Sequence, residues 1–115
     1  MNNNVFQSQI SNITDKDVKS LYTKTINDFN NYIDEIKKCG GKSAIEKQHN
    51  KGRLIARERI KYLIDDDSSF LEIGLFAGYD MYNEYGGAPA SGVITGIGKI
   101  RGNDFMIIAN DATVK

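Results

Sequence analysis

The stretch GVITGIGKIRGNDFMIIA, residues 92–109, decides the fold class of this 115-residue chain. Its two halves, 92–100 and 104–109, are rich in β-branched and aromatic residues, and the turn-forming sequence RGND separates them. Two strand-like runs joined by such a short turn are typical of a β-hairpin. A third strand-like run lies upstream at residues 70–73. The second half of the chain is therefore predicted to be built of strands.

The glycines of this stretch invite comparison with a nucleotide-binding loop. After Gly96 and Gly98 the next glycine is Gly102, so the GxGxxG spacing is absent, and a strand rather than a helix follows. We favour glycines that allow close packing or a bulge within a strand. The last strand runs into the polar residues 110–115, and in α/β folds ligands gather where strands end.

The first half of the chain has the periodicity of helices. Apolar residues recur at three- and four-residue steps between Val18 and Ile36, which predicts a long amphipathic helix. Thr14 is placed to cap its start, and Gly40-Gly41 to supply a left-handed stop. Such a helix has to bury its apolar stripe against the rest of the chain or against a partner.

Two shorter helices are expected between the long helix and the strands. They span about residues 43–49 and 56–64, with Gly52 between them. Residues 79–91 are rich in Tyr and Gly around Pro89, the single proline, and predict a long irregular loop. Loops of this length usually serve a function or are partly mobile.

The composition excludes several classes of protein. Fifteen basic and fifteen acidic side chains give zero net charge, and 40% of the residues are hydrophobic, as in globular domains. One Pro and one Cys exclude a collagen-like or disulfide-stapled chain. The longest apolar run, 105–109, is too short to span a membrane. Residues 1–11 resemble neither a secretory signal nor a transit peptide, so we expect a cytoplasmic protein.

Cys39 and His49 are weak candidates for chemistry. The chain contains no other Cys or His, whereas a structural zinc site needs about four ligands. A Cys–His nucleophile pair is formally possible. A passive thiol and a histidine at a helix end are the interpretations that we favour, and no metal is expected.

A basic segment is the stronger candidate site. Residues 42–61 carry seven basic and two acidic side chains, and four of the bases fall where one helix ends and the next begins: Lys51, Arg53, Arg57 and Arg59. Guanidinium groups beside helix amino-terminal amides bind phosphates readily. Alternatively, the segment is a solvated basic face paired with the acidic residues 65–67. Nucleic acid is a weaker option because the chain has no net positive charge.

Several blocks together resemble one family. GKSAIEKQHNKGRLIARERI at 41–60 is similar to the opening motif of carboxyltransferase (beta) subunits of biotin-dependent acyl-CoA carboxylases. Further blocks also resemble motifs of these subunits: LFAGY at 75–79, EYGGAPASG at 84–92, and VITGIG at 93–98 leading to IIANDATVK at 107–115. The resemblance is strongest to the methylcrotonoyl-CoA and propionyl-CoA carboxylase type.

The resemblance implies an α/β fold of the crotonase (ClpP/crotonase) kind, built from repeated ββα units. Residues 1–39 would then be an amino-terminal helical segment, and 40–115 the truncated start of the amino-terminal carboxyltransferase domain. The catalytic backbone donors of the family lie in Gly-rich turns further along the chain. The resemblance therefore implies an amino-terminal fragment with no catalytic residue of its own.

The family moves CO2 from carboxybiotin to an acyl-CoA. This implies biotin on a partner domain or subunit, a coenzyme A thioester as substrate, a biotin carboxylase or biotin carrier partner, and a homo-oligomer. Lys51, Arg53, Arg57 and Arg59 would then bind the phosphates of CoA. Two alternatives stay open at this point: a biotin-dependent decarboxylase subunit and a non-catalytic assembly module.

Overall fold

The computed structural model describes residues 14–115. Residues 1–11, from which we expect a cytoplasmic protein, lie outside the described residues. The chain divides into two compact units, Met1–Tyr32 and Ile33–Lys115. Each unit is considered by itself.

The long helix α1 spans Asp15–Lys37, as its periodicity predicted. Thr14 caps it, because the Asp17 amide donates to the Thr14 hydroxyl at 3.2 Å and the Asp17 carboxylate accepts from the Thr14 amide at 3.3 Å. The predicted stop is partly wrong. The left-handed residues after α1 are Cys39, with φ 56°, and Gly41, with φ 85°, whereas Gly40 has no positive φ.

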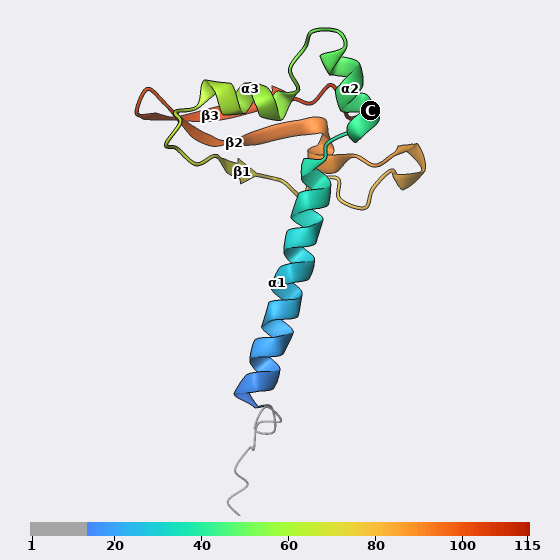
Figure 1. Cartoon of the computed structure of the whole chain (residues 1–115), viewed down its shortest axis with the longest axis vertical. Coiled ribbons are helices and arrows are strands. Elements are labelled where there is room, and N and C mark those ends of the chain that lie inside the picture. Colours follow the sequence, from blue (N-terminus) through green and yellow to red (C-terminus); the bar gives the residue numbers. More distant parts are fainter. Residues whose placement is uncertain (1–13) are drawn as a thin grey trace, which may run out of the picture. The chain divides into compact units, whose positions relative to one another are not determined.

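The second unit contains the other helices and the sheet (Figure 1). The helices are α2, Lys42–His49, and α3, Ala56–Leu63, and the strands are β1, Leu71–Ile73, β2, Val93–Ile100, and β3, Asn103–Asn110. The predicted loop between β1 and β2 contains two short 3-10 turns, Asn83–Tyr85 and Pro89–Gly92.

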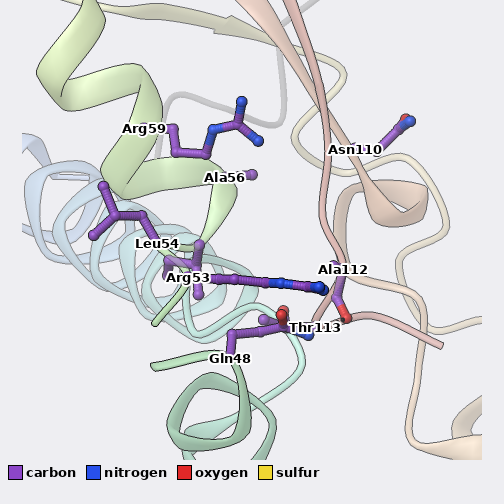
Figure 2. A pocket seen from close by; sticks show the side chains of 9 residues that line it. Gln48, Arg53, Leu54, Ala56, Arg59, Asn110, Ala112 and Thr113 are labelled. Atoms are coloured by element: carbon purple, nitrogen blue, oxygen red, sulfur yellow. Dashed lines mark hydrogen bonds between the residues drawn. The ribbon is translucent and has the colours of Figure 1, made fainter. Parts of the chain in front are cut away.

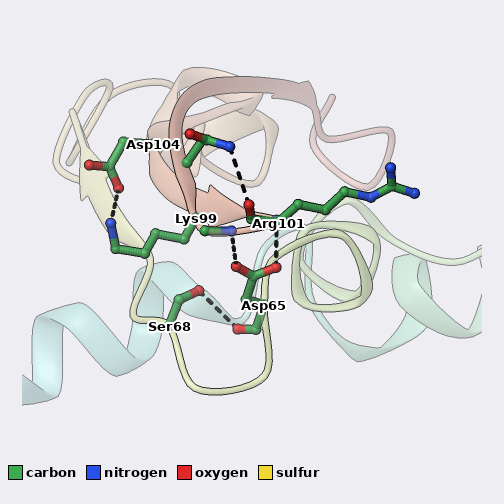
Figure 3. Close-up of polar contacts among 7 residues, drawn as sticks. Asp65, Ser68, Lys99, Arg101 and Asp104 are labelled. Carbon is green, nitrogen blue, oxygen red and sulfur yellow. Dashed lines mark hydrogen bonds and ion pairs between the residues drawn. The ribbon is translucent and has the colours of Figure 1, made fainter.

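The predicted hairpin is present. Strand order is β1-β2-β3, with both pairs antiparallel, and Ile100 faces Asn103 across a two-residue turn. Both turn residues, Arg101 and Gly102, have positive φ, at 51° and 78°, which matches the right-handed twist of the strands. The carboxylate of Asp65 accepts hydrogen bonds from both turn amides, at 2.7 and 2.8 Å (Figure 3).

A small core holds α3 against the sheet. Ala56 and Ile60 of α3 pack on Ile94 of β2 and Ile107 of β3, all of them buried. The strand glycines allow this close packing, because a Cβ at Gly98 would lie 2.7 Å from the side chain of Ile64, which directly follows α3. The strands pair without interruption across this position, so the glycines serve packing and not a bulge.

The opposite face of the sheet is apolar and exposed. Side chains alternate between the two faces of a strand, so residues paired across the sheet share a face. Leu71 of β1 and Met106 of β3 both pair with Ile97, and Ile73 and Ile108 both pair with Thr95. The four side chains are 47–69% exposed. One face is therefore a core and the other an uncovered apolar surface.

Candidate anion-binding groove

A groove of about 490 Å³ lies where the α2–α3 connection and the start of α3 face the end of β3 (Figure 2). Its lining combines apolar and polar groups. The polar members come from both sides of the groove: Gln48, Arg53, Arg59, Asn110 and Thr113. The groove lies at the end of β3, the place where a ligand was expected from the sequence.

Two of the four predicted bases line this groove. Arg53 precedes α3 and extends toward the segment that contains Ala112 and Thr113, and Arg59 lies on α3 itself (Figure 2). Both side chains are exposed, and neither has an ion-pair partner within the described residues. Two uncompensated guanidinium groups at one groove make it electropositive.

The other two bases lie elsewhere. Lys51 is exposed in the turn after α2 and does not line the groove. Arg57 makes a bidentate ion pair with Glu72 of β1, at 2.7 and 2.8 Å, and both side chains are largely buried. Burial acts to lower the pKa of Arg57, but the bonds and charge of Glu72 outweigh it and raise the pKa. The guanidinium of Arg57 is thus engaged inside the fold.

The basic segment does not pair with the acidic residues that follow it. Asp65 caps the hairpin turn, and within residues 14–115 no ion pair joins Asp66 or Asp67 to a base. The alternative of a basic face neutralised by this acidic run is therefore wrong for the described residues.

His49 and Glu58 join α2 to the start of α3. His49 Nε2 lies 2.9 Å from a carboxylate oxygen of Glu58, which also accepts the amide hydrogen of Ile55 at 2.9 Å. The hydrogen bond to His49 first, and that from Ile55 second, lower the pKa of Glu58. The histidine is at a helix end, as expected, and helps to fix the connection that carries Arg53.

Cys39 has the character of a passive thiol. Burial, reinforced by Asp111, raises its pKa to about 11, so the thiol stays protonated near neutral pH. Among residues 14–115 there is no cluster of three or more His, Cys, Asp or Glu side chains that could hold a metal ion.

A buried polar network lies behind the groove wall opposite the arginines. Asp111 and Thr113 are only 7% and 6% exposed. The Thr113 hydroxyl donates to Asp111 Oδ1 at 2.6 Å and accepts the amide hydrogen of Gly40 at 2.9 Å. Residue-by-residue reading of the sequence missed this network, although the polar run after the last strand was a signal for it.

Comparison with known proteins gives consistent results. Residues 47–115 match the family model of the carboxyl transferase domain. The chain is 41% identical over 90 residues to the probable mitochondrial methylcrotonoyl-CoA carboxylase beta chain of Drosophila melanogaster, covering 78% of this chain and 15% of that protein. It is 46% identical over 91 residues to the Dictyostelium discoideum mitochondrial beta chain, covering 79% and 15%.

A solved structure is also similar. Transcarboxylase 12S, described as a hexamer assembly with methylmalonyl-coenzyme A and methylmalonic acid bound, matches with a TM-score of 0.71 and 33% identity, over 80% of this chain and 18% of that one. The chain spans about 15% of the length of the curated relatives named above. Its leading helices and antiparallel hairpin form part of an α/β, crotonase-like fold. The chain belongs to the carboxyl transferase domain family.

Proposed function

We propose that this chain is the amino-terminal part of the carboxyltransferase component of a biotin-dependent acyl-CoA carboxylase, and that its groove binds a phosphate of coenzyme A. The reaction is transfer of CO2 from carboxybiotin to an acyl-CoA, with methylcrotonoyl-CoA as the favoured class of substrate. The names of the relatives support a carboxylase over a decarboxylase or an assembly module. Residues 1–39 would be a helical segment, and 40–115 the start of the carboxyltransferase domain.

One observation carries the phosphate assignment: Arg53 and Arg59 line the same groove and have no acidic partner among the described residues. The groove also includes Ile55 and Ala56 at the start of α3, where the helix dipole favours an anion. Guanidinium groups hold phosphate oxygens through two parallel hydrogen bonds. Of the anionic groups of CoA, we assign the 3′-phosphate to this groove.

Arg53 and Arg59 therefore form the proposed site, and Lys51 contributes a positive charge nearby. Arg57 supports the site indirectly, since its pair with Glu72 ties α3 to β1. We assign no catalytic residue to this chain. The enolate formed at the acyl group would be stabilised by preorganised donors outside residues 14–115.

The cofactor and partners belong to the same proposal. Biotin carries the activated CO2, and a biotin carrier or biotin carboxylase partner would bring it to the acyl-CoA. We propose a homo-oligomer of carboxyltransferase subunits in the cytoplasm, without nucleic acid or a membrane. Among the described residues no helix is long and apolar enough to cross a bilayer.

The test is a pair of substitutions in the complete carboxyltransferase subunit. Arg53→Ala combined with Arg59→Ala should weaken CoA binding about 10- to 100-fold, because each charge-assisted hydrogen bond contributes about 1.5–3 kcal/mol, discounted here for exposure. Binding of 3′-dephospho-CoA should change much less. Isothermal titration with both probes measures the difference.

Lys47→Ala is the matched control, since Lys47 is an exposed base of the same segment that does not line the groove. It should leave both dissociation constants within about twofold of the parental values. An equal loss of CoA and 3′-dephospho-CoA binding in the arginine variant would sink the 3′-phosphate assignment. If Lys47→Ala weakened CoA binding as much as the arginine variant does, the arginines would act only through their general positive charge.

A further inference from the structure

We infer that Thr113 and Asp111 are positioning residues of the anion groove: their buried hydrogen bonds fix the wall that faces Arg53 and Arg59. This inference rests on the proposed function. Neither side chain needs to touch a phosphate, because the polar atoms that carry the argument are turned toward the protein interior.

The Thr113 hydroxyl has a defined direction. It accepts the amide hydrogen of Gly40 at 2.9 Å, and it donates its own hydrogen to Asp111 Oδ1 at 2.6 Å. The same carboxylate oxygen accepts the Thr113 amide hydrogen at 2.9 Å. A hydroxyl can donate only one hydrogen, so the donor and acceptor roles of Thr113 are both used inside the fold.

These bonds tie the end of β3 to segments far away in the sequence. Gly40 lies 73 residues before Thr113. The Asp111 amide donates to the carbonyl of Gly92, the residue immediately before β2, at 2.8 Å. Gln48 of α2 donates to the carbonyl of Ala112 at 3.3 Å. Residues 111–113 are therefore held from three directions.

The backbones also approach closely at this point. A Cβ placed on Gly40 would lie 1.8 Å from the carbonyl oxygen of Thr113, so only glycine permits the approach. Thr113 and Ala112 are themselves part of the groove lining, across from Arg53 (Figure 2). A displacement of this segment would change the width of the groove without altering either arginine.

The position of the wall matters because it sets the space in which a phosphate can meet the two guanidinium groups. Guanidinium–phosphate bonds depend on planar, paired geometry, and small displacements of a binding group weaken recognition strongly. Loss of the Thr113 hydroxyl would leave the Gly40 amide without its acceptor, and Asp111 Oδ1 would keep only its hydrogen bond from the Thr113 amide. The segment would then lose its fixed direction toward the groove.

The experiment uses Thr113→Val and Thr113→Ser in the complete carboxyltransferase subunit, with CoA and 3′-dephospho-CoA as probes. Valine keeps the shape of threonine but lacks the hydroxyl, whereas serine keeps the hydroxyl. We expect Thr113→Val to reduce the preference for CoA over 3′-dephospho-CoA at least fivefold, and Thr113→Ser to retain it within about twofold. A loss of folded protein lowers the binding of both probes equally, so the ratio separates positioning from stability.

Asp111→Asn is the alternative test variant if Thr113→Val does not fold. Its side-chain oxygen still accepts from Thr113, but the bonds lose their charge assistance and become roughly half as strong. We expect a smaller reduction of the same ratio, about two- to threefold. Parental ratios in Thr113→Val and Asp111→Asn, or in the one of them that folds, would overturn the inference while leaving the proposed function intact. Parental ratios in the combined Arg53 and Arg59 variant would overturn both.

Discussion

At the scale of single residues, two arginines of one short helix have different roles. Arg57 and Arg59 are two positions apart, and side chains at this spacing point to nearly opposite sides of an α-helix. Arg57 consequently meets Glu72 of β1, while Arg59 faces the groove beside β3. The two residues are of the same type and almost adjacent in the sequence. Only the direction of each side chain decides which one pairs with Glu72 and which one lines the groove.

We predict that Arg57→Met destabilises the contact between α3 and β1 by about 3 kcal/mol, because it leaves the carboxylate of Glu72, with its side chain 10% exposed, without a partner. Hydrogen exchange of the amides in α3 and β1 measures this, with an expected acceleration of roughly 100-fold. The double variant Arg57→Met with Glu72→Met should recover part of the loss. An Arg57 variant that folds normally but loses its preference for CoA would contradict this structural role.

At the scale of elements, the hairpin turn is stabilised by a side chain from outside the hairpin. Arg101 adopts a left-handed conformation, which is unfavourable for a residue other than glycine. Asp65 follows α3, and its carboxylate accepts hydrogen bonds from the amides of both Arg101 and Gly102 (Figure 3). The end of the helix and the turn of the hairpin thus stabilise each other.

This arrangement predicts a pH dependence of the turn. Hydrogen bonds from Gly102 first, and Arg101 second, lower the pKa of Asp65. A lowered pKa in the folded state means that the stabilisation is complete above the ordinary pKa of an aspartate. It is lost as the pH falls through the lowered folded value.

Amide NMR during acidification should record the shift of Gly102 changing at a pH below the normal range for aspartate. Asp65→Asn should abolish this transition, because the amide side chain does not titrate. Asp66→Asn, at an exposed neighbouring position, should leave it unchanged. A Gly102 transition at the ordinary aspartate pKa would contradict the assignment of Asp65 as the capping group.

At the scale of the whole molecule, the described sheet has one covered face and one uncovered face. Leu71, Ile73, Met106 and Ile108 are 47–69% exposed on the face opposite α3. β3 also forms an edge of the sheet. Exposed apolar faces and unpaired strand edges promote association between molecules.

We therefore predict that the 115-residue chain on its own self-associates and catalyses no carboxyl transfer. Met106→Lys combined with Ile108→Lys should shift it toward the monomer in size-exclusion chromatography with light scattering. Tyr62→Lys is the matched control, since Tyr62 is a 79% exposed side chain of α3. A soluble monomer with a sharp melting transition in the unaltered chain would contradict this prediction.

Sequence patterns were sufficient for the elements and for the family. The long helix, the two shorter helices and the hairpin follow from periodicity and turn chemistry, which depend on neighbours a few residues apart. The carboxyltransferase motifs identified the family, and the basic segment pointed to the region of the groove. Local interactions of this kind are encoded in consecutive residues, which is why they can be read directly.

Tertiary structure alone decided which of these residues meet. The separation of Arg53 and Arg59 from Arg57, and the use of Asp65 in a turn instead of a basic pair, depend on how α3 packs on the sheet. The bond between Gly40 and Thr113 joins positions 73 residues apart, and no local pattern specifies it. Such contacts form only when the whole unit packs, because their partners are selected by burial and direction in space.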